Sequence, residues 1–534
     1  DTMFIGVIKY DADGNEIKLK NRLVYRGDQL SGKMASYEKD SPAVRVPGIK
    51  CGEANKALRG QSEIDFDFEA AYLQSKSTKV SICRAPFGHR ERDEDGVEFY
   101  WLLNTALYGQ PDAGLMWNKT INAHLVGTEE EDCGMLRCDV EPCMYNKRCG
   151  DNMTEHVSIP LYVDDGKINF DETKAARAEA MKIKEKMSKK YNVVFGAENK
   201  RDTFMLSANI RRHNAHCTTI FAKSYFEKIA KEHLKKPLES YPEGWTKNPA
   251  AKELNDLYEQ ALQKTDVLEG QDYDDYGSLW GALNFGTNFR PELSYAVGIG
   301  GRCRTFPTVG MYNAMLRVLV YAVRNSELGL TYAGKGKDAK KLRVRCDSDW
   351  HTRRSTTGYG IMLANSLIHH NSHRQHAIAC SSCEAEMMAL ADAALELEYV
   401  IQVLAHLGHE FEYDVEFETK THDAEKRIAE AEAYVIRHGS VEVGTDNTGA
   451  HDLCHRTTSG QHSRHIDRKV NKMRELNHLG KVHVIHVSTN DNWADIFTKP
   501  LDSLTFARHR DTILNVKAIP KDKGGEEKVE GSWS

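Results

Sequence analysis

Adjacent aspartates at the end of a strand-like run are the first residues that could do chemistry. Asp164 and Asp165 precede Gly166, whose freedom lets the backbone turn sharply. Such dense negative charge favours a hard divalent cation such as Mg²⁺, which prefers carboxylate oxygens. Asp65 and Asp67, at a second strand end, could bring another carboxylate to the same site. Two ions held there would activate a primer 3′-hydroxyl and steady a leaving pyrophosphate, although solvated turns also carry such pairs.

A second set of four acids is dispersed over the C-terminal half. These are Asp347 after the strand-like run 342–346, Glu386 at the start of a helix at 384–407, Asp446 after the strand-like run 441–444, and Asp495 within 493–496. Four carboxylates could converge on one two-metal centre that positions water against an RNA phosphate. Spacing alone leaves that convergence open.

Periodicity predicts the elements that must position these acids. In the first half it predicts a β-hairpin at 4–26 with its turn at 11–14, a strand at 64–68, helix formers from Glu69, a strand at 157–163 and a helix at 171–190 capped by Asp171. In the second half it predicts a connecting stretch at 236–275, helices over 276–325, a linker at 333–341 and an α/β unit from 342. The acidic stretch 410–442 has the character of an insertion, and the charged tail after Pro520 favours disorder.

Composition limits the class of protein. A chain of 534 residues with 40% hydrophobic and 28% charged residues is typical of several globular domains. No apolar run reaches membrane-spanning length and no signal architecture is visible, so we expect an intracellular protein with reduced cysteines. A net charge of -6 argues mildly against nucleic-acid binding, but basic residues need only line one groove. The opening Asp1 suggests a cut from a precursor or a gene fragment.

Several motifs of the N-terminal half resemble the reverse transcriptases of copia-type LTR retrotransposons. They are residues 20–27, 41–45, 67–73, 107–109 with Trp117, 162–165, 204–206, 276–279 and 290–293, in the family's order and spacing. The resemblance implies a right-hand polymerase with fingers, palm and thumb, whose metal ligands are Asp67, Asp164 and Asp165. It departs from the family at 110–115, where a Lys-Gln-Ala-Pro stretch is usual, and this puts the template and nucleotide contacts of that loop in doubt.

The same resemblance implies a set of nucleotide-binding residues. These are Lys20 and Arg22 over the incoming triphosphate, Tyr72 beneath the sugar, and Tyr108, Gly109 and Tyr162. The positive charges of Lys20 and Arg22 suit a phosphate, and the bulk of Tyr72 would exclude a 2′-hydroxyl. A core aromatic at Tyr72 and a solvated hairpin face at Lys20 and Arg22 stay open as alternatives.

Later motifs are similar to the ribonuclease H of the same elements. They are residues 346–350, 353–359, 381–386, 445–447 and 494–501. This similarity assigns metal binding to Asp347, Glu386, Asp446 and Asp495, with Asp349 and Glu384 as near alternatives. His462, His465 and Asp467 match a further segment, for which we expect a structural or substrate-side role.

Three other interpretations have some support. His369, His370, His373 and His376 precede Cys380 and Cys383, so a zinc site is conceivable, although no second CxxC completes it. A host-adopted nucleic-acid binder would gain nothing from keeping seven buried carboxylates. A hydrolase that uses only the second cluster leaves the first cluster unexplained.

The sequence therefore predicts a multidomain protein of α/β and α+β class. The expected domains are fingers and palm at 1–222, thumb and connection at 223–341, a ribonuclease H-like α/β domain at 342–515 and a disordered tail at 516–534. We expect DNA synthesis on RNA and DNA templates, hydrolysis of the RNA strand of hybrids, and Mg²⁺ or Mn²⁺ as cofactor. Expected partners are an RNA template, a DNA primer, RNA/DNA hybrid, deoxynucleoside triphosphates, and the capsid and integrase of the element, in a cytoplasmic virus-like particle or the nucleus and not at a membrane.

Overall fold

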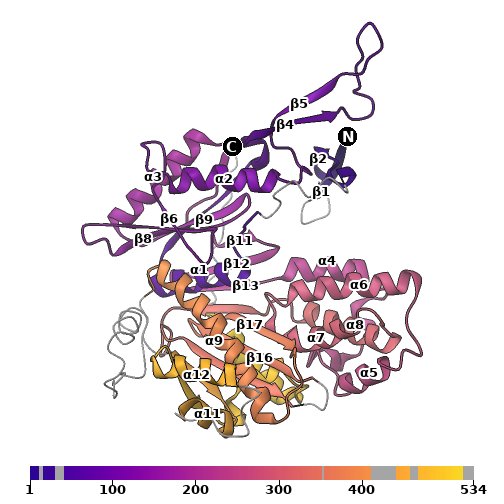
Figure 1. Ribbon diagram of the computed structural model, residues 1–534, viewed down its shortest axis with the longest axis vertical. Helices are drawn as coiled ribbons and strands as arrows, with labels where there is room; N and C mark the ends of the chain where they lie inside the picture. Colours follow the sequence, from indigo (N-terminus) through magenta and orange to yellow (C-terminus); the bar gives the residue numbers. More distant parts are fainter. Residues whose placement is uncertain (11–15, 31–40, 351–353, 410–440, 457–466, 521–534) are drawn as a thin grey trace, which may run out of the picture. The chain divides into compact units, whose positions relative to one another are not determined.

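The computed structural model describes residues 1–10, 16–30, 41–350, 354–409, 441–456 and 467–520 (Figure 1). They form two compact units. The first unit contains Asp1–Gly48 and Ser62–Lys200, and the second contains Ile49–Gln61 and Arg201–Ser534. Sheets and helices alternate in both, which confirms the predicted mixed α/β class. Among the described helices, none combines the length and the apolar character that a membrane span requires.

The first unit is built on a six-stranded antiparallel sheet. Its order is β10 (Val193–Phe195), β3 (Ser62–Phe68), β9 (Asp165–Phe170), β8 (Glu155–Tyr162), β7 (Met144–Cys149) and β6 (Leu136–Arg137). Side chains alternate along β3, so Ile64, Phe66 and Phe68 enter the core. The alternation places Asp65 and Asp67 on the other face of the sheet.

Two helices bury the apolar face of this sheet. They are α2 (Ala113–Val126) and α3 (Lys174–Lys190), which contribute Trp117, Ile121, Ile183 and Met187 to the core. The predicted cap Asp171 is wrong: Thr173 caps α3 by accepting the N–H of Ala176. Asp171 lies too early in the chain, and its carboxylate accepts the N–H of His156 on β8 instead.

Two hairpins complete the first unit. The predicted one consists of β1 (Thr2–Tyr10) and β2 (Glu16–Tyr25), followed by η1 (Gly27–Leu30). The helix expected after Glu69 is only a short 3-10 turn, η3 (Ala71–Gln74). A second hairpin follows, with β4 (Lys76–Arg84) and β5 (Tyr100–Thr105), because the run from Lys76 is rich in residues that favour strands over helices.

In the second unit, a four-stranded antiparallel sheet has the order β11 (Asp202–Met205), β12 (Ala208–Asn214), β13 (Cys217–Phe221) and β14 (Gly329–Ala333). Most of helix α1 (Val46–Arg59) also belongs to this unit. Within this sheet β13 pairs with β14, which lies more than 100 residues later in the chain, and all four strands belong to the second unit.

Helices follow this sheet along the chain. They are α4 (Lys223–His233), η4 (Leu238–Ser240), η5 (Glu243–Thr246), α5 (Leu254–Ala261), α6 (Gly270–Gly286), η6 (Pro291–Leu293), α7 (Ser294–Arg302) and α8 (Val309–Arg324). The stretch 236–275, expected as a plain connection, thus contains α5 and the start of α6. Leu254 and Ala261 of α5 are buried, which explains why this polar segment is helical.

The last part of the second unit has a five-stranded mixed sheet. Its order is β17 (Ser366–Arg374), β16 (Thr356–Leu363), β15 (Arg343–Asp349), β18 (Val441–Thr445) and β19 (Val482–His486). The first three strands are antiparallel, and β15, β18 and β19 are parallel. Asp347 lies within β15 rather than after it, because the strand continues to Asp349.

Helices and short turns accompany this sheet: α9 (Ser382–His406), α11 (Thr448–His455), α12 (Asp467–His478), η8 (Thr489–Asp491), η9 (Trp493–Phe497), α13 (Ser503–Leu514) and η10 (Val516–Ala518). Ser381 caps α9 by accepting the N–H of Glu384. The tail predicted from 516 is ordered at first, because η10 follows α13 and the Ala518 carbonyl accepts a hydrogen bond from Cys217. Residues 410–440 of the predicted insertion and 521–534 of the tail lie outside the described residues.

Candidate active sites

The first carboxylate cluster is assembled by two paired strands of the first unit. Asp67 on β3 lies opposite Asp165 at the start of β9. The backbone N–H of Phe68 donates to the carbonyl oxygen of Asp164 at 3.0 Å, which fixes the turn beside β3. Asp67 is therefore next to the Asp164–Asp165 turn, although it is almost 100 residues away in the chain.

The turn between β8 and β9 is unusually tight. Tyr162 and Asp165 are paired across it, so only Val163 and Asp164 form its loop. Val163 has φ 57°, a left-handed conformation that a β-branched residue rarely adopts. The indole Nε1 of Trp117 on α2 donates to the Val163 carbonyl oxygen at 2.6 Å and holds this conformation.

The electrostatics of the cluster fit a divalent cation. Burial, the negative charges of Asp164 and Asp67 and a hydrogen bond with Asp67 together raise the pKa of Asp165 to about 7. A carboxylate surrounded by like charges is unfavourable unless a proton or a cation neutralises it. Oxygen donors of this kind suit Mg²⁺, so the residues present fit the ion.

Aromatic and basic side chains lie beside these aspartates. The rings of Tyr72, from η3, and Tyr108 have centroids 5.0 Å apart. The guanidinium of Arg22 on β2 lies 5.1 Å from the centroid of the Tyr108 ring. Burial raises the pKa of Tyr72, as does the charge of Asp164, so the phenol stays protonated near this charge. The structure thus gathers Arg22, Tyr72 and Tyr108 close to the carboxylates.

The remaining predicted nucleotide-binding residues hold the backbone around this group. The N–H of Tyr25 donates to the Tyr108 carbonyl at 2.7 Å. Gly109 has φ 81°, and a Cβ there would lie 2.2 Å from the Tyr25 carbonyl oxygen, so only glycine fits. Lys20 lies on β2 opposite Val7, and its side chain is outside the described part of the structure. Gln110, in the divergent loop, is buried and accepts the N–H of Leu107.

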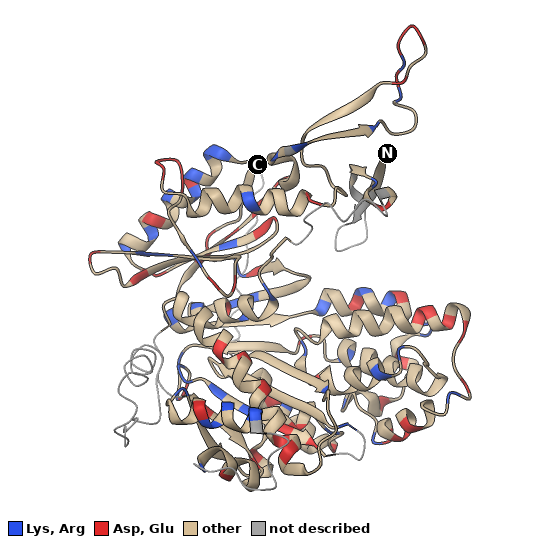
Figure 2. Cartoon of the chain, in the orientation of Figure 1, with Lys and Arg blue, Asp and Glu red and all other residues tan. Residues whose placement is uncertain are grey.

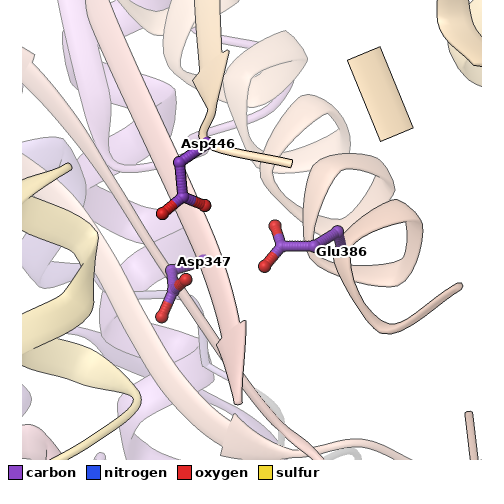
Figure 3. Close-up of side chains that lie close together, drawn as sticks. All are labelled: Asp347, Glu386 and Asp446. Atoms are coloured by element: carbon purple, nitrogen blue, oxygen red, sulfur yellow. The ribbon is translucent and has the colours of Figure 1, made fainter. Parts of the chain in front are cut away.

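The second carboxylate cluster is formed by three elements of the five-stranded sheet region. Asp347 on β15, Glu386 on α9 and Asp446 after β18 each offer an oxygen, and the three oxygens lie within 4.8 Å of one another. Figure 3 shows Glu386 reaching from its helix toward the two aspartates. Across the described ranges, no other group of three His, Cys, Asp or Glu residues comes as close.

Hydrogen bonds orient this triad. The two oxygens of Glu386 accept the Ser348 N–H at 3.0 Å and the Thr445 hydroxyl at 3.1 Å. Asp347 accepts the hydroxyl of Thr498. Because both ends of Glu386 are held, the carboxylate keeps one orientation without an ion, as expected of a preorganised site.

Asp495 joins the triad through a lysine. The ammonium of Lys499 lies 3.0 Å from Asp495 and 3.5 Å from Asp347. Burial lowers the pKa of Lys499, but the charges of Asp347 and Asp495 outweigh it and the pKa is raised. Burial and then the charge of Asp347 raise the pKa of Asp495 to about 7.

Burial also raises the pKa of Asp347. For Glu386, burial and the charges of Asp347 and Asp446 together raise the pKa well above its ordinary value. Three crowded carboxylates with a net negative charge form a donor set that a hard divalent ion would relieve. The residues present therefore fit a magnesium or manganese ion. Lys499, Thr498 and Thr445 are absent from the predicted site residues, although all three lie within or beside the motifs that carry the carboxylates.

The near alternatives are turned away from the triad. Asp349 accepts both the N–H and the hydroxyl of Thr356 on β16. Glu384 accepts the N–H of Cys380 at 2.6 Å and so completes the cap of α9. Their carboxylates are engaged in local structure.

The zinc interpretation finds no support in the geometry. His369 and His373 on β17 contact Glu396 and Asp392 of α9 at 3.2 and 3.4 Å. His370, which is half-buried, shares a hydrogen bond with Ser294. These histidines thus have protein partners, and within the described residues none joins Cys380 and Cys383 in a metal-binding group. His462 and His465 lie outside the described residues, and Asp467 begins α12.

Comparison with known proteins shows which family and which relatives the chain is similar to. Residues 3–235 match the family model of reverse transcriptase (RNA-dependent DNA polymerase). The chain is 24% identical over 97% of its length to the retrovirus-related Pol polyprotein from transposon RE2 of Arabidopsis thaliana, of which it covers 32%. It is 22% identical over 92% of its length to that from transposon TNT 1-94 of Nicotiana tabacum, of which it covers 34%. The chain thus spans about a third of the length of these curated relatives.

Among solved structures, the foamy viral protease-reverse transcriptase in complex with double-stranded DNA has a similar fold. The TM-score is 0.50 at 12% identity, and the match covers 92% of this chain and 65% of that one. The family model and the relatives agree with the motifs of the sequence. Residues 3–235 thus match the reverse transcriptase family, and over most of its length the chain is similar to Pol polyproteins of copia-type retrotransposons.

Proposed function

We propose that the first unit synthesises DNA on RNA and DNA templates, and that the C-terminal part of the second unit hydrolyses the RNA strand of RNA/DNA hybrids. The observation that carries the proposal is the convergence of distant acids into two separate clusters. Asp67 lies opposite Asp165 in one, and Asp347, Glu386 and Asp446 lie within 4.8 Å in the other. The match of residues 3–235 to the reverse transcriptase family model supports the polymerase part.

In the polymerase site, Asp67, Asp164 and Asp165 would hold the divalent ions. When bound, such ions lower the pKa of the attacking hydroxyl and neutralise charge on the phosphates. The side chain of Arg22, held over Tyr108, supplies a fixed positive charge for the triphosphate. The ring of Tyr72 excludes a sugar 2′-hydroxyl by its bulk, and its contact with Tyr108 keeps it from moving aside.

In the hydrolytic site, Asp347, Glu386, Asp446 and Asp495 would hold the ions. The hydrogen bonds from Ser348 and Thr445 orient Glu386. Lys499 balances part of the negative charge. Both sites act on phosphate groups and not on bases, so binding of the nucleic acid should depend on its shape and charge rather than on base sequence. We propose an RNA template, a DNA primer, deoxynucleoside triphosphates and RNA/DNA hybrid as partners, and Mg²⁺ as the ion.

The test measures two activities of the full chain with two matched variants. Primer extension on an RNA template and cleavage of RNA in a hybrid are assayed with Mg²⁺. We expect Asp164→Asn to lose synthesis and keep cleavage, and Asp347→Asn to lose cleavage and keep synthesis. Loss of both activities in either variant would show that the sites are not independent. An intact, folded chain that binds hybrid and has neither activity would instead be a nucleic-acid-binding protein.

A further inference from the structure

The β4–β5 hairpin carries an unusual amount of exposed apolar surface. Ile82 and Leu102 are cross-strand partners on one face, and they are 58% and 59% exposed. Arg84 and Tyr100 form the next pair on that face, and Tyr100 is also exposed. Val80 is 83% exposed at the start of this row. On the opposite face Cys83 is buried, so one face of the hairpin packs against the protein and the other is exposed to solvent.

A two-stranded sheet with a bare apolar face is an unfavourable arrangement for an isolated chain. Two strands alone are marginally stable in water, and large contiguous apolar patches on protein surfaces mark interaction sites. Phe87 and Phe99, in the loop that joins the strands, add to the exposed surface. The hairpin therefore has the character of a surface that another molecule covers.

The unpaired edge of β5 indicates what kind of contact would cover the hairpin. Its sequence, Tyr-Trp-Leu-Leu-Asn-Thr, has no charge, no proline and no glycine. Proteins usually protect exposed edge strands with charged residues or proline, and an unprotected apolar edge pairs with another strand. Among the described strands, β4 is the only one that pairs with β5. The unpaired edge is thus open to strand addition.

The distribution of charge indicates which strand is added. Two lysines, Lys76 and Lys79, lie at the base of the hairpin on β4, and no acid lies on that strand. Three consecutive acids, Asp93, Glu94 and Asp95, lie in the loop at the far end, and Figure 2 shows acidic residues at its tip. If two copies paired antiparallel, the acidic tip of each would approach the basic base of the other. The same acidic tip would repel the phosphates of a nucleic acid.

We propose that β5 pairs antiparallel with β5 of a second copy of this chain, about a twofold axis. The pairing forms a four-stranded sheet and buries Ile82, Tyr100 and Leu102 of both copies. An isologous contact of this kind closes on itself, so it gives a dimer and not a filament. Because β5 is uncharged, no like charges face one another in the new pair of strands.

The test is the self-association of the full chain, measured by sedimentation velocity over a wide range of concentrations. Leu102→Lys places a charge on the pairing strand and should raise the dimer dissociation constant roughly tenfold or more. The matched control is Leu136→Lys, because Leu136 is an equally exposed leucine on the edge strand β6 of the same unit. It should leave the dissociation constant unchanged. Tyr100→Lys is a second variant with the same expected loss.

A charge exchange tests the antiparallel arrangement. Lys76→Glu and Glu94→Lys should each weaken self-association. An equal mixture of the two variants should restore it, because in the mixed dimer the base of each hairpin faces a tip of opposite charge. A wild-type chain that stays monomeric at all concentrations would overturn the proposal. A Leu102→Lys variant that dimerises normally would also overturn it. If that variant in addition binds a single-stranded template oligonucleotide more weakly, the hairpin is a nucleic-acid-binding surface.

Discussion

Asp67 on β3 lies directly opposite Asp165 on β9, and a hydrogen bond joins their carboxyl groups while burial keeps the pKa of Asp165 near 7. Carboxylates placed this close repel one another, and a divalent cation between them would relieve that repulsion. The pairing of β3 with β9 therefore decides whether the first cluster can work.

Asp67→Asn should lower the rate of primer extension on the order of 100-fold or more, because a neutral amide is a poorer ligand for a divalent ion and no other acid lies opposite Asp165. The measurement is single-turnover extension with Mg²⁺. Asp139→Asn, an exposed acid in the same unit, is the control and should extend primers normally. A variant with near-normal extension would remove Asp67 from the site.

Glu386→Gln and Glu384→Gln form a matched pair on the same helix. Glu386 faces the triad, so its substitution should reduce cleavage of hybrid RNA on the order of 100-fold or more. Glu384 accepts the N–H of Cys380, and glutamine can still accept that bond, so Glu384→Gln should cleave normally. The reverse pattern of cleavage rates would assign the metal to Glu384.

Lys499→Met should destabilise the metal-free protein. The variant leaves Asp347 and Asp495 without the ammonium between them, a loss of about 1 kcal/mol because the lysine is partly exposed to water. We expect thermal unfolding in chelator to shift downward, and added Mg²⁺ to raise the midpoint more than in the wild type. Lys472→Met, a lysine of similar exposure beside Glu398, is the control. Equal midpoints in chelator would contradict this role.

Tyr72→Ala should admit ribonucleotides. The ring lies against Tyr108 beside the carboxylates, and removing it opens the space for a 2′-hydroxyl. The ratio of kcat/KM for deoxynucleotide over ribonucleotide should fall roughly 10-fold to 100-fold. Tyr72→Phe keeps the ring and should keep the ratio. If both variants behave alike, Tyr72 is a packing residue.

His409 should make stability depend on pH. It is buried and shares a hydrogen bond with the Lys340 carbonyl, and burial lowers its pKa from 6.5 to about 4. In the unfolded chain His409 binds a proton below pH 6.5, whereas in the folded chain it binds a proton only below about pH 4. The contribution of His409 is therefore complete above pH 6.5 and is lost as the pH falls toward 4. The measurement is the free energy of unfolding in urea, for wild type and His409→Gln, at pH 7 and at pH 5. Between these two pH values the wild type should lose about 2 kcal/mol more than the variant. An equal loss in both proteins would contradict the assignment.

The sequence predicts the carboxylates better than their surroundings. Motif similarity and strand ends indicate Asp347, Glu386 and Asp446, and the central position of β15 beside β18 explains why they meet. The choice between Glu384 and Glu386 depends on how α9 is rotated against the sheet, which local periodicity does not define. Lys499 shows the same limit, since its position between two acids depends on how η9 packs against β15.

Long-range pairing also explains the errors in the predicted elements. The residues after Glu69 have helical character, but β4 gains a partner in β5, which lies across a long loop. Thr173 rather than Asp171 caps α3, because the backbone of β8 competes for the Asp171 carboxylate. In both cases a residue far away in the chain overrides a local preference.

The left-handed conformation of Val163 has an evolutionary consequence. A β-branched residue in that conformation costs about 1–2 kcal/mol, and the indole of Trp117 offsets part of this cost through its bond to the Val163 carbonyl. The two positions should therefore change together among related elements. Copies that have lost the indole should carry glycine or asparagine at the turn, since those residues accept the backbone geometry without support.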